Sequence, residues 1–325
     1  IPISILFMNK PGVVLISTLL IVMVMSIISI QISKNFFLSI QRDLYIDFKN
    51  HSLQQLLSSE KQTIKSIQKE IISSNGKLIN KDPVLNQSYF FSNELATIQV
   101  DVSDASNCFN LNSVFIKTSD SVQIKKDNRE WLERLLRLKG LDAPEIESFI
   151  DQLIDWVDPD NQPLNFGAEN YFYIGPLSPI NQYTPKRLLS NFSEIKNFPV
   201  LEQISFKKIS KNLCVLPGLS NQLINVNTLN DSHTNLIASL FDEENLEFIE
   251  SQILDTPENG YDSANEFANK ITQSAPWPSQ VLSINSKTFL ISTKIYNQTF
   301  SNQLDSLVIL DTSNSAKVLN RDFIF

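Results

Sequence analysis

The sequence has few of the residues on which enzymes most often depend. It contains two histidines and seven glycines among 325 residues. It has no Gly-x-Ser-x-Gly nucleophile motif, no glycine-rich loop of the kind that holds phosphates, and no His-Glu-x-x-His zinc motif. These absences weigh against serine-hydrolase, nucleotide-dependent and zinc-peptidase functions.

Positive charge is also scarce. The formal net charge is −8 and the isoelectric point is near 4.9, whereas nucleic-acid binding needs a cationic surface that displaces counterions. We therefore expect no nucleic-acid partner. Residues 225–228 (Asn-Val-Asn-Thr) resemble a turn of helix-hairpin-helix DNA-binding modules, but no cluster of Lys and Arg accompanies them. A structural turn with Thr228 or Asn230 as a helix cap is the favoured interpretation.

The amino-terminal region lacks charges over a short stretch and helix breakers over a much longer one. Residues 13–33 are 21 residues without a charge, enough to cross a bilayer as a helix. No Gly or Pro occurs in residues 13–74, and no Ala-x-Ala-like signal peptidase site follows the apolar run. The sequence therefore predicts one helix of roughly 60 residues, with its first third in lipid and an amphipathic remainder that stops at Asn75-Gly76. An anchor followed by a coiled coil is the alternative.

The pattern of apolar residues after this helix predicts an α+β fold. Apolar residues make up 42% of the chain, and its length suffices for two folding units or one unit with a large insertion. Alternating residues predict strands at both ends of this region, with a helical block between them. The expected strands are 88–91, 96–102, 288–296, 307–310 and 316–319. Helices are expected to begin at the caps Asp127 and Asp142 and at Thr184, and further helices are expected at 236–240, 244–254 and 264–271. Strands from both ends would pair into one sheet against the lower part of the long helix.

Cysteine is limited to Cys108 and Cys214. Lys10 is the only charged residue ahead of the apolar run, and positive residues stay on the cytoplasmic side of a membrane helix. Most of the chain is therefore expected on the far side, which is the periplasm of a Gram-negative cell. In that oxidising compartment the two cysteines predict one disulfide, which would stabilise the fold by ~4 to 5 kcal/mol. Two separate buried thiols are the alternative.

One group of acidic residues carries the site chemistry that the sequence offers. Asp151, Asp155 and Asp158 fall at i, i+4 and i+7 and so share one face of a predicted helix. They lie at its carboxyl end, where like charges repel and the helix dipole disfavours anions. A positive group is therefore expected nearby.

The loop that follows these acids adds further oxygen donors. Asp158, Asp160, Gln162 and Glu169 provide hard oxygen ligands of the kind that Ca²⁺ uses. The spacing is not that of an EF-hand, Mg²⁺ accepts fewer protein ligands, and Zn²⁺ would require His or Cys nearby. Solvated turn acids without a metal, and a pair of catalytic carboxylates as in glycosidases, are the alternatives.

The residues around the start of the apolar run resemble those of type IV prepilins and type II secretion pseudopilins. Lys10 and Gly12 precede the run as a short basic leader would. The resemblance implies that prepilin peptidase removes residues 1–12 by cutting between Gly12 and Val13. Most such proteins carry Glu at the fifth mature position, where this chain has Ser17. A carboxylate in hydrocarbon is costly unless it is paired, so its absence points to a subunit with no neighbour above it.

Four later motifs, in order along the chain, resemble those of the GspK family of minor pseudopilins. They are residues 108–112 (Cys-Phe-Asn-Leu-Asn), 155–160 (Asp-Trp-Val-Asp-Pro-Asp), 167–170 (Gly-Ala-Glu-Asn) and 224–228 (Ile-Asn-Val-Asn-Thr). The resemblance implies a pilin fold with a large helical domain inserted between its β elements, calcium bound in that domain, and no enzymatic activity. It also implies a place at the tip of the type II secretion pseudopilus, with GspI and GspJ as partners and GspH and the major pseudopilin as further candidates.

Carried over by position, the resemblance makes Asp158, Asp160 and Glu169 the expected calcium ligands, with Asp155 and Gln162 as weaker candidates. A minor pilin of a type IV pilus, and a membrane-tethered periplasmic hydrolase that uses the Asp cluster, are the alternative functions. The expected parts of the chain are a leader (1–12), a helix spanning the inner membrane (13–33), its periplasmic continuation (34–75), a first β part (76–112), an inserted helical domain with the calcium site (113–280) and a second β part (281–325).

Overall fold

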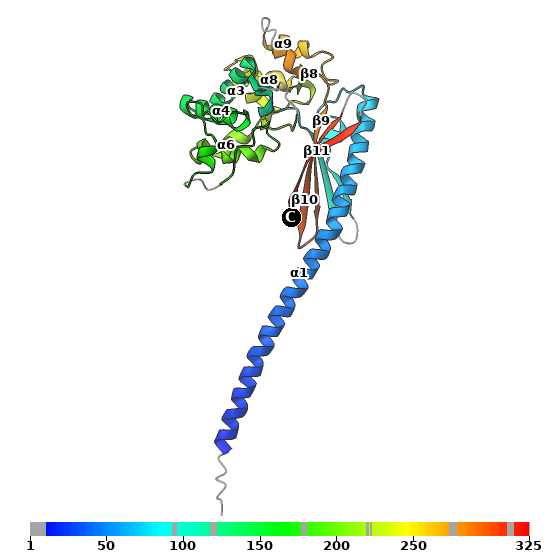
Figure 1. Ribbon diagram of the computed structural model, residues 1–325. Coiled ribbons are helices and arrows are strands. Elements are labelled where there is room, and N and C mark those ends of the chain that lie inside the picture. Colours follow the sequence, from blue (N-terminus) through cyan, green and yellow to red (C-terminus); the bar gives the residue numbers. More distant parts are fainter. Residues whose placement is uncertain are drawn as a thin grey trace, which may run out of the picture.

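The computed structural model of the protein describes most of the chain. The residues that it leaves undescribed are 1–10, 93–95, 118–121, 177–180, 219–220, 222, 273–277, 311–314 and 325. Most of the leader expected at residues 1–12 therefore lies outside the described residues. Figure 1 shows three parts: a long rod, a sheet packed on the upper part of the rod, and a helical body beside the upper end of the sheet.

The rod is one helix, α1 (Pro11–Ser73), which confirms the predicted single helix. The large apolar side chains of residues 13–32 are 47–68% exposed. Among the described helices, α1 alone is long and apolar enough to cross a membrane. Ser17 lies in this apolar part, and its hydroxyl donates to the Val14 carbonyl of the same helix at 2.9 Å. The helix stops where expected, because Asn75-Gly76 turns left-handed with φ values of 56° and 84°.

A five-stranded antiparallel sheet packs on the upper part of α1. The strands, in spatial order, are β1 (Tyr89–Ser92), β2 (Thr97–Asp104), β9 (Thr288–Tyr296), β10 (Ser301–Leu310) and β11 (Ala316–Ile324). β2 pairs with β9, so segments from before and after the helical body meet in one sheet, as predicted. Leu56 and Ile67 of α1 are buried with Leu304 and Phe289 of the sheet, and this apolar contact fixes the sheet on the rod. β10 and β11 both run beyond the predicted 307–310 and 316–319.

The inserted body, residues 105–287, connects β2 to β9 and is mostly helical. Its helices are α3 (Lys126–Leu138), α4 (Ala143–Val157), α5 (Asn170–Tyr173), α6 (Phe206–Ser210), α7 (Thr234–Phe241), α8 (Leu246–Leu254), α9 (Ala264–Ile271) and α10 (Pro278–Val281), with 3-10 turns η1 (Leu111–Val114), η2 (Phe192–Asn197), η3 (Pro199–Glu202), η4 (Val226–Thr228) and η5 (Asp231–His233). Short strands are β3 (Phe109–Asn110), β4 (Phe115–Lys117), β5 (Val122–Ile124), β6 (Leu213–Cys214), β7 (Ile224–Asn225) and β8 (Leu282–Ser283); a short helix, α2 (Pro83–Asn86), precedes the sheet. Buried aromatic residues such as Trp131 and Phe109, whose rings meet edge to face at 4.8 Å, build its core.

Two predicted helix caps have different outcomes. Asp142 caps α4 as expected, because its carboxylate accepts from the Glu145 amide at 2.9 Å while Glu145 accepts from the Asp142 amide. Asp127 does not cap α3. The helix begins at Lys126, with Lys125 at the cap position, and Asp127 lies in the first turn, where its charge still suits the helix dipole.

The prediction of a helix that begins at Thr184 is wrong. Residues 181–191, all described, contain no helix. Lys186 has a φ of 51°, in the left-handed region that a right-handed helix excludes. The amide and hydroxyl of Thr184 both donate to the Asn170 side chain, at 2.7 and 2.8 Å. Thr184, which would open the helix, is therefore bound to the first residue of α5.

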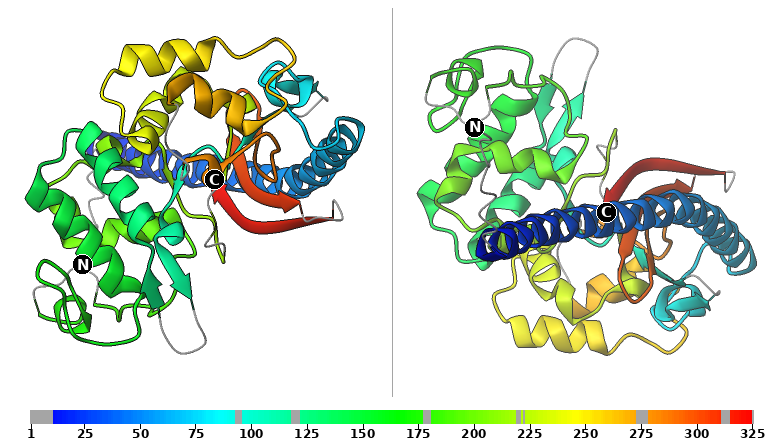
Figure 2. Two further views of the ribbon diagram at one scale, coloured as in Figure 1. Left: turned by 90° about the horizontal axis from the view of Figure 1, so that it is seen from above. Right: turned by 90° about the horizontal axis from the view of Figure 1, so that it is seen from below.

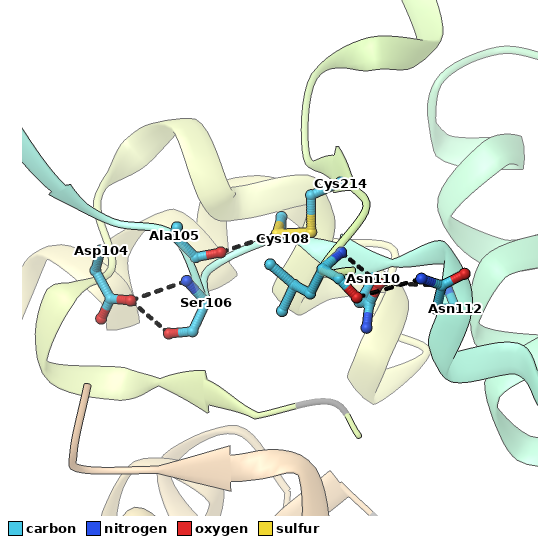
Figure 3. The surroundings of a disulfide bond; sticks show 8 residues. Asp104, Ala105, Ser106, Cys108, Asn110, Asn112 and Cys214 are labelled. Atoms are coloured by element: carbon cyan, nitrogen blue, oxygen red, sulfur yellow. Dashed lines mark hydrogen bonds between the residues drawn. A yellow bond between two sulfur atoms is a disulfide. The ribbon is translucent and has the colours of Figure 1, made fainter. Parts of the chain in front are cut away.

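The predicted disulfide between Cys108 and Cys214 is confirmed, with the two Cα atoms 5.8 Å apart. It links the start of β3 to β6, two short strands that pair in parallel (Figure 3). The two cysteines lie 106 residues apart, so the bond closes a loop that contains α3, α4 and the acid-rich segment after α4. Closing so long a loop removes much of the freedom of the unfolded chain.

Two asparagine turns, residues 110–112 and 225–227, share one geometry. In each turn the first Asn side chain accepts from the amide of the second Asn, at 3.2 and 3.0 Å. The second Asn of the first turn binds the amide and carbonyl of Leu189, both at 2.9 Å. The second Asn of the later turn binds the same groups of Tyr261, at 2.6 and 3.1 Å. The later turn is therefore structural, as expected, and Asn230 caps η5 after it.

Candidate metal centre

Three of the predicted ligands come together at the carboxyl end of α4. Asp158 is the cap residue of that helix, Asp160 lies two residues further on, and Glu169 is the amino-terminal cap of α5. One carboxylate oxygen from each lies within 4.8 Å of those of the other two. Glu169 is buried, Asp158 is half-buried and Asp160 is exposed. We call these three residues the acid cluster, and it leads from the interior of the inserted body to its surface.

Hydrogen bonds do not balance the negative charge of the acid cluster. Oδ1 of Asp158 is buried and has no hydrogen-bond partner among the described residues. Burial raises the pKa of Asp158 to about 7, and the charges of the neighbouring carboxylates act in the same direction. A buried anionic oxygen without a partner is costly. The cluster therefore favours a cation.

The positive group expected near these acids is Lys186. Its Nζ donates to Oε1 and Oε2 of Glu169, at 3.0 and 2.7 Å, and also to the carbonyl oxygen of Asp160. No sequence pattern links Lys186 to the acids, because it lies 17 residues beyond Glu169 in an irregular segment. Only the folded chain brings this ammonium group into the cluster.

Asp155 and Asp151, one and two turns before the end of α4, hold the following loop in place. The Leu164 amide donates to both carboxylate oxygens of Asp155, at 3.3 and 3.2 Å, and the Phe166 amide donates to Asp151 at 3.1 Å. A Cβ at Gly167 would lie 1.9 Å from Oδ2 of Asp155, so a larger residue there requires this carboxylate to move. Burial raises the pKa of Asp155 to about 6. Asp155 lies outside the group of acids that converge within 4.8 Å.

Gln162 and Asn170 complete the surroundings of the cluster. Gln162, a weaker ligand candidate, is exposed and donates its backbone amide to Oδ1 of Asp160 at 2.8 Å. Asn170 donates from Nδ2 to the Asn161 side chain at 2.8 Å and accepts the Thr184 amide through Oδ1. Asn170 thereby joins the acid loop to the segment that carries the ammonium group.

The arrangement of oxygens suits a hard divalent cation. The cluster offers three carboxylates and a backbone carbonyl, and Ca²⁺ binds roughly six to eight such oxygens in flexible geometry. The three converging residues include no His or Cys, which disfavours zinc. A cavity of about 350 Å³ lies elsewhere, where residues such as Leu213 and Leu290 line the junction of the inserted body and the sheet. None of the three residues of the acid cluster lines this cavity.

A long helix on a small antiparallel sheet, with a helical body inserted between the strands, defines a pilin-like protein. The family model for type II secretion system (T2SS), protein K, matches residues 107–218. This range includes both cysteines and the acid cluster. A chain in the crystal structure of the GspK-GspI-GspJ complex from enterotoxigenic Escherichia coli has the same fold, with a TM-score of 0.70 at 20% identity. The match covers 85% of this chain and 98% of that chain.

Relatives with sequence similarity give the same assignment. The type II secretion system protein K of Klebsiella pneumoniae is 31% identical over 147 residues, which are 45% of this chain and 44% of that protein. The putative type II secretion system protein K of Escherichia coli K12 is 22% identical over 241 residues, 72% of this chain and 70% of that protein. The protein K of Aeromonas hydrophila is 23% identical over 78% of both chains. Residues 107–218 thus match the protein K family of type II secretion systems, and the relatives that match over longer stretches carry the same name.

Proposed function

We propose that the chain is the tip subunit of the type II secretion pseudopilus, where it initiates assembly and supports protein export across the outer membrane. The observation that carries this proposal is the position of the inserted body. The body lies at the end of the sheet remote from the apolar half of α1, and its helices spread to both sides of the line of α1 (Figures 1 and 2). A further subunit that added above would collide with this body, so the filament would grow only from below.

The apolar half of α1 provides the means of assembly. Its side chains at residues 13–32 are exposed, so they would lie in the inner membrane and then pack among the same segments of partner subunits. We propose GspI and GspJ of the same secretion system as these partners, since the matched crystal structure is a complex with them. GspH and the major pseudopilin would follow below. Ser17 suits the uppermost subunit, because its hydroxyl is satisfied within α1 and needs no partner from above.

The anchor also sets the proposed location. Prepilin peptidase would cut between Gly12 and Val13, in the first turn of α1, and remove residues 1–12. The mature chain would remain a single-pass protein of the inner membrane with its bulk in the periplasm. The confirmed disulfide fits an oxidising compartment. We assign the chain no enzymatic activity.

We also propose that the acid cluster binds Ca²⁺. Asp158, Asp160 and Glu169 would supply the ligands, and the unpaired Oδ1 of Asp158 supports this. Asp155 and Gln162 are candidates for outer contacts that keep the loop in shape. The ion would neutralise the cluster and fix the loop between α4 and α5, which is a structural role.

Deletion of the gene tests the assembly role. We expect loss of protein export and of pseudopilus initiation, both restored by the wild-type chain. The full chain should also co-purify with GspI and GspJ of its own system from detergent extracts. Export and fibre initiation that proceed unchanged without the gene would overturn the proposal. Loss of surface pili with export intact would favour a minor pilin of a type IV pilus.

A further inference from the structure

Lys186 fills the acid cluster with a cation that belongs to the chain itself. An ammonium group has three hydrogens to donate, and Nζ of Lys186 has three acceptors. These are both carboxylate oxygens of Glu169, at 3.0 and 2.7 Å, and the carbonyl oxygen of Asp160. The Lys186 side chain is 21% exposed and that of Glu169 is 1% exposed. The ion pair is therefore shielded from water and is stronger than a surface pair.

The backbone around Lys186 is arranged to deliver this ammonium group. Lys186 adopts a left-handed φ of 51°, a conformation that costs any residue other than glycine free energy. Thr184, two residues earlier, is held by Asn170 through two hydrogen bonds. Asn170 is itself bound to Asn161 in the acid loop. Lys186 is thus part of a braced structure and differs from a mobile surface lysine.

The ammonium group and a bound calcium ion would need the same oxygens. Glu169 and the Asp160 carbonyl are the groups that Lys186 uses, and they are also oxygen donors suited to Ca²⁺. Two cations that shared these oxygens would repel each other strongly in a partly buried site. Only one of them can occupy the cluster at a time.

We propose that Lys186 is a tethered competitor of Ca²⁺. Its ammonium group occupies the acid cluster when calcium is scarce and leaves when the ion binds. The loop between α4 and α5 is then held in place in both states, and the affinity for calcium is lower than the acids alone would give. This inference rests on the calcium binding proposed above and adds its regulation by a residue of the chain.

Removal of the ammonium group has a predictable direction. If it occupies the cluster in about nine of ten calcium-free molecules, its removal raises the calcium affinity about tenfold. Without it, Glu169 becomes a buried anion that has lost its cation, so the calcium-free chain should melt at a lower temperature. Calcium should then raise the melting temperature of the variant more than that of the wild type.

Calorimetric titration of Ca²⁺ into the full chain in detergent micelles, after treatment with chelator, tests this. Lys186→Met keeps an unbranched side chain only one atom shorter and removes the charge, and Lys186→Gln serves if the first variant does not fold. The matched control is Lys270→Met, because Lys270 also pairs with an acid, Asp255, at 2.8 Å but outside the cluster. We expect tighter calcium binding in the Lys186 variants and an unchanged affinity in the control.

The outcomes separate this inference from the calcium site itself. If the wild type binds calcium and Lys186→Met binds it equally or less tightly, the competition is overturned while the site stands. Weaker binding would mean that Lys186 orders the acids for the ion. If neither the wild type nor the variants bind calcium, the calcium site fails and the competition fails with it, whereas the proposed role at the pseudopilus tip is unaffected.

Discussion

The asparagine turns and the acid cluster are both polar motifs in loops of the inserted body, yet their hydrogen bonding differs. In the later turn, the second Asn side chain has one amide oxygen and one amide nitrogen, and the backbone of Tyr261 binds both. In the acid cluster, three carboxylates lie near the ammonium group of Lys186, and Oδ1 of Asp158 has no partner among the described residues. A motif that pairs its own polar groups needs nothing further. A motif with surplus negative charge requires a cation.

Replacing Asn227 by Leu should give the largest effect. The amide and carbonyl of Tyr261 would lose their partner, at a cost of ~1–3 kcal/mol each, so the free energy of unfolding should fall by about 4 kcal/mol. The loss should be equal in calcium and in chelator, because this turn needs no cation. Denaturant unfolding of the full chain in micelles measures it, with Asn269→Leu on the exposed face of α9 as the control. A much larger loss in chelator would show that turn and cluster are coupled.

The parts that the sequence predicted correctly have local signals. The stop of α1 at Asn75-Gly76 and the capping box at Asp142 each depend on residues within one turn of the chain. The same holds for the turn at 225–227, where the first Asn binds an amide two residues away. Pairing of β2 with β9 was predictable because strands with alternating patterns at both ends of the insertion need partners.

The gaps in the prediction concern contacts between distant residues. The Thr184 segment has a residue pattern that allows a helix, but Asn170 binds Thr184 and the backbone turns left-handed at Lys186. Neither fact is visible from local propensity. The sequence predicted the acids because they lie at the end of one helix and in the loop that follows it. The lysine that balances them comes from an irregular segment, where no pattern indicates it. The charge argument predicted that a cation was needed, and the fold determines which one is present.

Gly167→Ala should give the second largest loss of stability, and it should also affect the acid cluster. The new methyl group would lie 1.9 Å from Oδ2 of Asp155, so the carboxylate must move and lose the Leu164 amide. We expect a loss of about 2 kcal/mol in stability, together with weaker calcium binding, because the loop that carries Asp160 and Glu169 shifts.

A double-mutant cycle provides the control for this prediction. Asp155→Ala removes the group that the methyl would strike, so adding Gly167→Ala to it should cost little. Unfolding free energies of the wild type, both single variants and the double variant give the coupling. Additive losses would contradict the proposed clash.

Asp158→Asn should have a smaller effect on stability and a decisive effect on the response to calcium. The substitution removes one of three negative charges in the acid cluster, so in chelator the chain should be more stable by about 1 kcal/mol. The rise in melting temperature on adding calcium should disappear, because the unpaired carboxylate oxygen is lost. Glu258→Gln removes a charge from an exposed loop and should leave that rise intact. A calcium response that survives in Asp158→Asn would place the ion elsewhere.

The smallest expected effect is a pH dependence in chelator that separates the cluster from the asparagine turns. The pKa of Asp158 is raised to about 7 by burial in the folded chain, against about 3.9 in an unfolded chain. Between these values the folded state binds a proton that the unfolded state does not, so stability from this residue rises as the pH falls from about 7 to about 4. Solvent screening keeps the gain near 1 kcal/mol or less. The gain should be smaller in Asp158→Asn, where Asp155 with its raised pKa still contributes, and unchanged in Asn227→Leu. Identical pH profiles for the wild type and Asp158→Asn would contradict the raised pKa of Asp158.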